Sequence, residues 1–268
     1  PAFKINHVTT MYEDTFGTSW FGTNGGGIVR LAKHSFSALS SFTSNGEEYI
    51  KTIQQSDGRN IIVGTERGGI QKITMGEKGE IIGVEPFLEH QLPKNMLFRT
   101  MVQLKQNAMY LATDIGLIHF DGKNVFTFTT ANGLPNNSIT ALATDRDGVL
   151  WIGTSNGLAT LSNGNIQQYT TADGLTNNSI RTLFVDINNT VWIGTDGGGV
   201  NRFLRFNGKK QFDSLTSDEG LVNNFVRTIF QDSEQNIWIG TRNGLSQLHI
   251  RKFELYGKKF GLSDSYVR

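Results

Sequence analysis

One short motif recurs six times along the chain, at intervals of about 41 to 48 residues. It is clearest as Trp151-Ile152-Gly153-Thr154 and returns, in the same or a looser form, in five other places. Its Gly, replaced by Ala in one copy, stands at positions 22, 64, 112, 153, 194 and 240. A fixed period of this length is typical of architectures in which each copy forms one supersecondary unit. We therefore expect one array of six such units across residues 1–268.

The fourth copy shows the strand pattern of the unit. Period-two alternation of apolar and polar residues predicts strands over 139–144, 149–154, 158–161 and 166–170. Asp145-Arg146-Asp147-Gly148 separates the first two strands, and Asn163-Gly164 forms a tight hairpin, since both residue types accept a positive φ. A connector of the form Asp173-Gly174-Leu175-Thr176-Asn177-Asn178-Ser179 then leads to the next copy. The unit is predicted to be a four-stranded antiparallel sheet.

Such a sheet has two apolar faces and must be covered on both. Copies that stack around a common axis provide this cover, so the predicted fold class is all-β, a β-propeller of four-stranded antiparallel blades. The Trp of each second strand is the expected filler between blades, because a buried aromatic covers about 150–250 Å². The Gly that follows it suits a crowded position where another backbone or side chain approaches closely.

The two ends of the chain overlap in the repeat frame. Gly261-Leu262-Ser263-Asp264-Ser265-Tyr266-Val267-Arg268 matches the connector and strand start at 174–181, while Asn6-His7-Val8-Thr9-Thr10 matches 178–182. We expect the chain to be a piece of a longer array. Its six copies are compatible with a closed six-bladed ring or with most of a seven-bladed one.

Composition narrows the function classes. The chain has 31 Gly, no Cys and a formal net charge of +1, so disulfides and Cys-based zinc sites are excluded and no strong field for nucleic acid is expected. Its longest apolar stretches are far shorter than the ~20 residues that cross a bilayer, so no membrane contact is expected from this segment. The five His form no close pair, and Asp145-Arg146-Asp147-Gly148 lacks the bidentate Glu of a calcium loop. We expect no metal and no cofactor.

The Trp-Ile-Gly-Thr strand, the Gly-Leu strand after it and the Asp-Gly-Leu-x-Asn-Asn connector together resemble the two-component regulator propeller repeat. The resemblance covers essentially the whole chain. It is close over residues 133–248 and looser before them, where Ile62 and Tyr110 replace the Trp. It implies a noncatalytic, ligand-sensing module from the periplasmic region of a bacterial membrane sensor, with a histidine kinase or diguanylate cyclase output elsewhere in the protein. It also implies that a second propeller often adjoins the first.

Candidate ligand-binding residues gather on the face that carries the connectors. The connectors contribute the amides Asn137, Asn178 and Asn224, and the residue after the start of each first strand is Thr9, Lys51, Arg99, Thr140, Arg181 or Arg227, with Arg268 in the incomplete copy. Because inner strands converge near the axis, we predict that Lys51, Arg99, Arg181 and Arg227 form a cationic collar. Such a collar suits an anionic ligand, such as an acidic saccharide, with guanidinium forks giving bidentate contacts. In the alternative interpretation, each cation pairs with a carboxylate of a neighbouring blade and each Asn serves only its turn.

Two other functions stay open at this point. The loop face suits a scaffold that docks another protein, an adjacent propeller or a second copy of the chain. Some propellers, such as the streptogramin lyases, are enzymes that use His and a metal on that face, but the scattered His positions of this chain argue against that chemistry.

Overall fold

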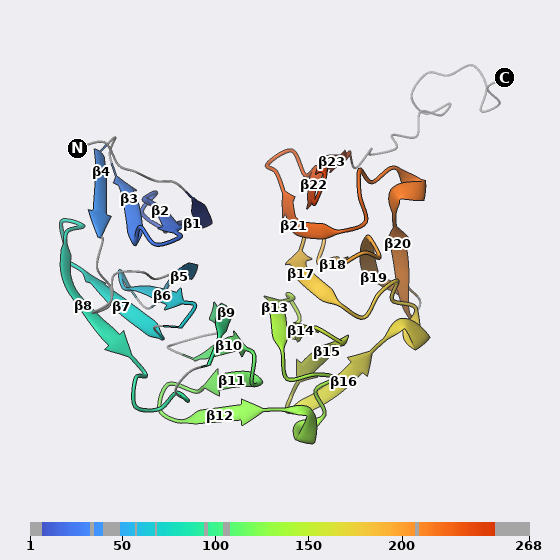
Figure 1. Ribbon diagram of the computed structural model, residues 1–268, viewed down its shortest axis with the longest axis horizontal. Coiled ribbons are helices and arrows are strands. Elements are labelled where there is room, and N and C mark those ends of the chain that lie inside the picture. The colour runs from blue at the N-terminus through green and yellow to red at the C-terminus, as the bar shows by residue number, and fades with distance from the viewer. Residues whose placement is uncertain are drawn as a thin grey trace, which may run out of the picture.

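The computed structural model describes residues 7–32, 35–39, 49–56, 58–67, 69–93, 96–103, 108–206 and 209–249. These residues form antiparallel sheets that follow one another along the chain, each with its strands in sequence order or its reverse. Figure 1 shows the sheets arranged as blades around a common centre. The predicted all-β propeller is confirmed.

The first three blades lie in the less regular half of the chain. Blade 1 contains β1 (Val8–Glu13), β2 (Ser19–Thr23), β3 (Ile28–Ala32) and β4 (Ser35–Leu39). Blade 2 contains β5 (Ile50–Gln55), β6 (Ile61–Thr65), β7 (Ile70–Met75) and β8 (Ile81–Phe87). Blade 3 contains β9 (Phe98–Gln103), β10 (Met109–Thr113), β11 (Leu117–Phe120) and β12 (Val125–Phe128).

The other three blades carry the regular repeats. Blade 4 contains β13 (Ile139–Thr144), β14 (Leu150–Thr154), β15 (Gly157–Ser162) and β16 (Asn165–Tyr169), within a residue or two of the predicted strands. Blade 5 contains β17 (Ile180–Val185), β18 (Val191–Thr195), β19 (Val200–Phe206) and β20 (Lys209–Leu215). The described part of blade 6 contains β21 (Val226–Gln231), β22 (Ile237–Thr241) and β23 (Gly244–Leu248).

The connectors contain short 3₁₀ turns that the sequence pattern did not reveal. These are η1 (Thr130–Asn132), η2 (Thr171–Asp173) and η3 (Ser217–Glu219). Each begins with a Thr capping box and ends at a Gly with positive φ, for example 104° at Gly174. In the described part of the chain, no helix has the length and apolar character needed to cross a membrane.

Three of the four Trp side chains, those of Trp20, Trp151 and Trp192, fill seams between described blades, as predicted. Trp151 is 1% exposed and belongs to an apolar cluster with Ile180 and Ile193 of the next blade. Its indole Nε1 donates a hydrogen bond of 2.9 Å to Asp145 Oδ2 in the turn between the first two strands. The same bond joins Trp20 to Asp14, Trp192 to Asp186 and Trp238 to Asp232. In blades 1, 4 and 5 the turn Asp is itself buried and is thus part of the blade core.

The small residue after the Trp-Ile pair forms a socket for the next blade. A Cβ built on Gly194 would lie 2.6 Å from Val226 Cγ1, and one on Gly153 would lie 2.6 Å from Ile180 Cγ2. Each socket therefore holds the first buried side chain of the following inner strand. The close approach predicted from the Gly is confirmed.

The sixth blade has one face that no described residue covers. Figure 1 shows a space between the ribbons of blades 1 and 6. Phe230 and Leu245 of blade 6 are 58% and 57% exposed, whereas Leu158 and Val200, which correspond to Leu245 in blades 4 and 5, are 0% exposed. That the chain comes from a longer array stays a prediction.

Candidate functional site

The residues of the predicted collar share one backbone feature. In β17, Ile180 pairs with Thr195 and Thr182 pairs with Gly194, so Arg181 between them has no partner across the strand pair. The same break in register falls on the corresponding residue of every inner strand, namely Thr9, Lys51, Arg99, Thr140, Arg181 and Arg227. A bulged residue is released from the alternation of the strand and its side chain is re-aimed.

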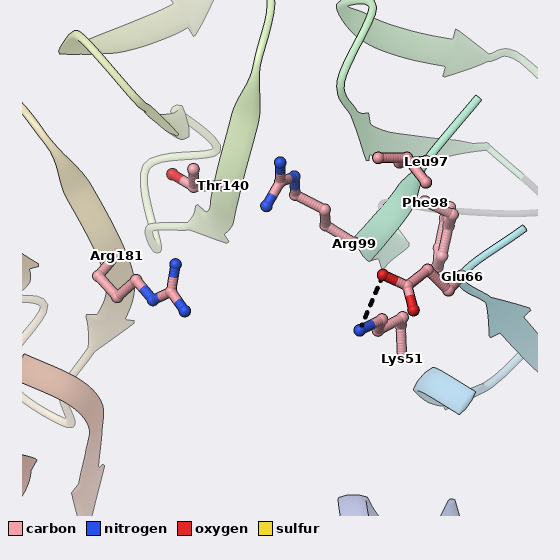
Figure 2. A pocket seen from close by; sticks show the side chains of 7 residues that line it. All are labelled: Lys51, Glu66, Leu97, Phe98, Arg99, Thr140 and Arg181. Atoms are coloured by element: carbon pink, nitrogen blue, oxygen red, sulfur yellow. Dashed lines mark ion pairs between the residues drawn. The ribbon is translucent and has the colours of Figure 1, made fainter. Parts of the chain in front are cut away.

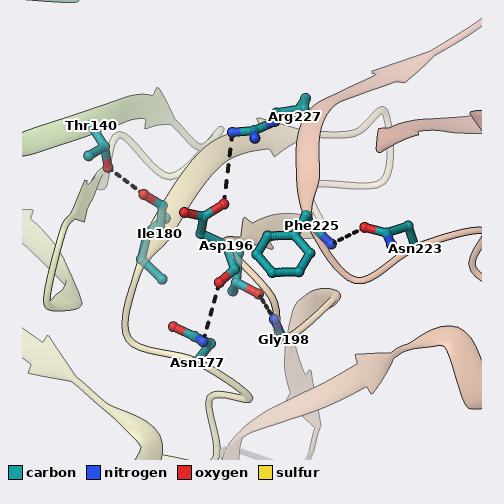
Figure 3. A network of polar contacts seen from close by, with 9 residues as sticks. Thr140, Asn177, Ile180, Asp196, Gly198, Asn223, Phe225 and Arg227 are labelled. Carbon is teal, nitrogen blue, oxygen red and sulfur yellow. Dashed lines mark hydrogen bonds and ion pairs between the residues drawn. The ribbon is translucent and has the colours of Figure 1, made fainter. Parts of the chain in front are cut away.

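The two Thr at this position link neighbouring blades. Thr140 Oγ1 donates to the carbonyl oxygen of Ile180 in the next blade at 2.7 Å (Figure 3). Thr9 Oγ1 donates to the carbonyl oxygen of Ile50 at 2.5 Å. At these two bulges, the short side chain therefore forms a hydrogen bond to the backbone of the next blade.

Three of the four basic side chains meet in one cavity. Lys51, Arg99 and Arg181 line a hollow of about 220 Å³ together with Glu66, Leu97, Phe98 and Thr140. Figure 2 shows the three cationic groups pointing from different inner strands toward the same opening. With Glu66 as the single carboxylate, the lining carries a net of two positive charges.

The three cations differ in how they are paired. Lys51 Nζ lies 3.5 Å from Glu66 Oε1, and both side chains are 33% exposed. Arg99 Nη2 donates to Ser138 Oγ over a long 3.4 Å, and its Nε is buried without a hydrogen-bond partner. Arg181 makes no hydrogen bond or ion pair with any residue that the structure describes. An anion entering the cavity would meet at least one guanidinium with all its donors available.

Arg227 lies outside this cavity. Its Nη1 is 3.8 Å from Oδ1 of Asp196, which belongs to blade 5 (Figure 3). This is the ion pair between blades that the alternative interpretation of the collar anticipated. The corresponding residue of the incomplete copy, Arg268, lies outside the described residues.

The connector asparagines hold the 3₁₀ turns. The Oδ1 atoms of Asn137, Asn178 and Asn224 accept hydrogen bonds from the backbone N–H groups of Thr130, Thr171 and Ser217 at 2.8, 2.8 and 2.7 Å. These three amides do not line the cavity. Turn duty is thus evident for all three, and ligand binding by them stays a prediction.

Glu66 was not among the candidates from the sequence. It follows the Gly-Thr of β6 and its N–H donates to the carbonyl oxygen of Tyr49 at 2.8 Å, which holds it beside the bulge at Lys51. Asp196 follows the Gly-Thr of β18 in the same way. The recurrence of an acidic residue directly after the repeat motif was the signal that could have found both.

The residues that line the cavity include no His. Over the residues that the structure describes, no group of three or more His, Asp and Glu side chains could hold a metal ion. His119 stacks on Tyr110 with ring centroids 4.3 Å apart, and burial lowers the pKa of His119 while Asp121 opposes that shift. His119 does not line the cavity.

Comparison with known proteins places this geometry in a family context. Residues 133–156, 174–197 and 220–243 match the two-component regulator propeller family, which confirms the predicted resemblance over the three regular repeats. No curated protein sequence matches the chain.

Solved structures show the fold. The extracellular domain of a hybrid two-component system of B. thetaiotaomicron superposes with a TM-score of 0.75 at 22% identity over 91% of this chain. The chain spans 33% of the length of that domain. Virginiamycin B lyase of Staphylococcus aureus gives a TM-score of 0.67 at 12% identity, covering 93% of this chain and 86% of the lyase. PorZ, a surface component of the type-IX secretion system of Porphyromonas gingivalis, gives 0.69 at 16% identity, covering 90% and 38%.

Proposed function

We propose that the chain is a noncatalytic sensor propeller and that its cationic cavity binds an anionic small molecule or oligosaccharide, such as an acidic saccharide. Its place would be the periplasmic input region of a bacterial two-component or diguanylate cyclase signalling protein. The family repeats and the fold shared with sensor ectodomains support the sensor role. The single observation that carries the ligand class is the convergence of Lys51, Arg99 and Arg181 on one hollow.

The chemistry of the cavity favours a carboxylate or sulfate on a small polar body. Guanidinium groups form planar, bidentate contacts with such anions, and charge-assisted bonds are about twice as strong as neutral ones. Tyr49, 44% exposed, lies beside Lys51 Nζ with 5.9 Å from the ring centroid to the nitrogen. An exposed aromatic ring next to a cation is suited to the face and the charge of an acidic sugar.

The test is calorimetric titration with digalacturonate and with a neutral disaccharide of the same length. Binding of the acidic sugar is expected to weaken steeply as salt rises and to be lost in Arg181→Ala, because the interaction is largely ionic. Arg146→Ala, which removes an exposed arginine outside the cavity, serves as the matched control and should bind normally. Equal binding of the neutral sugar, or binding that ignores salt, would contradict the proposal.

Arg181→Ala also distinguishes a role in ligand binding from a role in an ion pair that joins two blades. Because Arg181 has no partner among the described residues, its loss should leave the melting temperature within about 1 °C of the parent, as expected for an unpaired surface residue. A large drop in melting temperature would instead mean that Arg181 joins blades.

A second candidate is a protein-contact role, and the uncovered face of blade 6 favours it. Phe230 and Leu245 are large apolar side chains exposed on that face. An adjacent propeller or a second copy of the chain would cover them. Light scattering at several concentrations tests self-association, which Phe230→Ser should weaken if this face is used.

A further inference from the structure

Blades 2 and 5 carry the same ionic arrangement at corresponding positions. In each, a cation occupies the bulge of the inner strand and a carboxylate follows the Gly-Thr of the second strand, as Lys51 with Glu66 and Arg181 with Asp196. The carboxylate residue is anchored identically, because the N–H of Asp196 donates to the carbonyl oxygen of Ser179 at 2.9 Å, as that of Glu66 does to Tyr49 at 2.8 Å.

The two pairs also match in length. Arginine reaches one atom farther than lysine, and aspartate is one carbon shorter than glutamate. A contact between Arg181 and Asp196 would therefore span the same number of side-chain atoms as the observed contact between Lys51 and Glu66.

The observed pairing nevertheless differs between the two blades. In blade 2 the cation and the carboxylate of the same blade meet, with 3.5 Å between Lys51 Nζ and Glu66 Oε1. In blade 5 the carboxylate of Asp196 lies instead near Arg227 Nη1 of blade 6, at 3.8 Å. Arg181 is left without an ion pair or hydrogen bond to any described residue.

The hold of Arg227 on Asp196 is weak. At 3.8 Å the contact is an ion pair without a hydrogen bond, and Asp196 Oδ1 is buried with no hydrogen-bond partner. The side chains of Arg227 and Asp196 are 41% and 38% exposed, so solvent screens their attraction. A carboxylate held this loosely can exchange between two cations of similar reach.

We propose that Asp196 is a shared counter-ion for Arg181 and Arg227, and that Arg227 keeps the cavity receptive to anions by holding Asp196 away from Arg181. Arg227 is then a positioning residue, although it does not line the cavity. When Arg227 is removed, Asp196 pairs with Arg181. Arg181 is then no longer available to an anion, and the net positive charge of the cavity falls by half. The proposal rests on the proposed function only where it concerns ligand binding.

The first test needs no ligand. Phenylglyoxal modifies accessible, unpaired arginines, and peptide mass spectrometry gives the rate at Arg181 in the intact chain. Arg227→Ala should slow modification of Arg181 by about two- to fivefold, the range that a surface ion pair of this exposure supports. Asp196→Asn should not slow it, and the double variant Arg227→Ala/Asp196→Asn should restore the parent rate.

Two controls keep this test interpretable. Arg242, like Arg227, belongs to blade 6, and its guanidinium lies over the ring of Phe225 at 5.8 Å from the centroid. Arg242→Ala should leave the rate at Arg181 unchanged. Arg227→Lys retains the charge and should retain the rate. If Arg227→Ala fails to fold by circular dichroism, Arg227→Gln, which removes the charge but keeps most of the side chain, takes its place and should show the same slowing. An unchanged rate at Arg181 in folded Arg227→Ala, or no restoration in the double variant, overturns the shared counter-ion.

The second test uses inorganic phosphate as the anion. Protection of Arg181 by phosphate gives an apparent dissociation constant, which should rise about two- to fivefold in Arg227→Ala and return in the double variant. If phosphate fails to protect Arg181 in the parent while the rates without phosphate behave as expected, the anion site fails and the counter-ion exchange stands. If phosphate protects the parent and Arg227→Ala equally, the coupling between Arg227 and the cavity is refuted.

Discussion

Replacing Gly194 with alanine should destabilise the seam between blades 5 and 6. The new Cβ would lie 2.6 Å from Val226 Cγ1 and 3.1 Å from Val226 Cβ, across the seam, and 2.6 Å from Thr182 Cγ2 within its own blade. Carbon atoms pack best about 3.5–4.0 Å apart, so the neighbours would have to retreat by about 1 Å. A close-packed interior offers little room for that movement.

Two opposing effects set the change in the free energy of unfolding that Gly194→Ala causes. Overpacking a core typically costs about 1–3 kcal/mol. Alanine recovers about 0.4–1 kcal/mol relative to glycine, because it restricts the unfolded chain and Gly194 has an ordinary strand φ. We expect a net loss of about 1–2 kcal/mol, which for a chain of 268 residues corresponds to a drop in melting temperature of about 2–4 °C.

Gly240 supplies a matched control for the seam. A Cβ there would lie 2.7 Å from Thr228 Cγ2, the same contact within the blade that Gly194 has with Thr182, and the described residues place no side chain of another blade within 4 Å. Thr228 is exposed and can turn away. Gly240→Ala should therefore be close to neutral in urea unfolding followed by circular dichroism.

The difference between the two variants isolates the contact with Val226. Adding Val226→Ala to Gly194→Ala removes the clashing Cγ1, so the double variant should lose less stability than the sum of the two single variants. Equal destabilisation by Gly194→Ala and Gly240→Ala, or strict additivity in the double variant, would refute the idea that the seam socket sets the cost.

Three further outcomes follow from the hydrogen bonds of the blades. Asp186→Ala should lower the free energy of unfolding by about 1–3 kcal/mol in urea titrations, because the buried indole N–H of Trp192 loses its acceptor at 2.9 Å. The pKa of Asp232 lies below its ordinary value of 3.8, and the hydrogen bond from Trp238 is the largest cause. The ionised carboxylate therefore stabilises the fold above that pH. This stabilisation is lost as the pH falls through the lower pKa of the folded state. Asp232→Asn should therefore flatten the acid limb of a plot of unfolding free energy against pH. Asn178→Ala should cost about 1 kcal/mol in the same urea assay by freeing a connector N–H, and Asn178→Asp, which keeps an acceptor oxygen, should cost less.

The fold was predictable because the same strand and turn pattern occurs six times along the sequence. Strand alternation, the Asn163-Gly164 hairpin and the period of the motif all indicate one four-stranded unit, and the strands of blade 4 lie where the pattern puts them. The partner of each Trp was missed, although the evidence was present in the sequence. An Asp stands six residues before the Trp in four copies, with Asp145 and Trp151 as one example, and this spacing is the signal that could have found the bond. A turn accounts for only one carboxylate oxygen of Asp145, Oδ1, which accepts from the backbone of the turn. The other oxygen, Oδ2, accepts from the indole of Trp151, and turn chemistry does not predict that bond.

The placement of three of the predicted cations was predictable, but their pairing was not, and ligand binding by them stays a prediction. The equivalence of Lys51, Arg99 and Arg181 in the repeat frame placed them around one opening, and they do line a single cavity. The choice of Asp196 between two arginines depends on side-chain placement across a seam, which no local pattern encodes. The fixed roles of Asn137 and Asn178 in their turns likewise depend on the 3₁₀ geometry of the connectors, which has no helical periodicity to detect.

The bulge explains how one repeat combines a rigid ring with a variable opening. A residue in the regular ladder is constrained by its cross-strand partner and by the seam, as Ile180 is by Thr195 and the socket at Gly153. The next residue has no such partner, so a change there leaves the ladder and the socket intact. Thr140 uses this freedom to bond the next blade, while Arg181 projects its charge into the cavity. If the proposed function holds, stability and recognition fall on adjacent residues of the same strand, and removing the charge of Arg181 should change anion binding without loosening the contacts between blades.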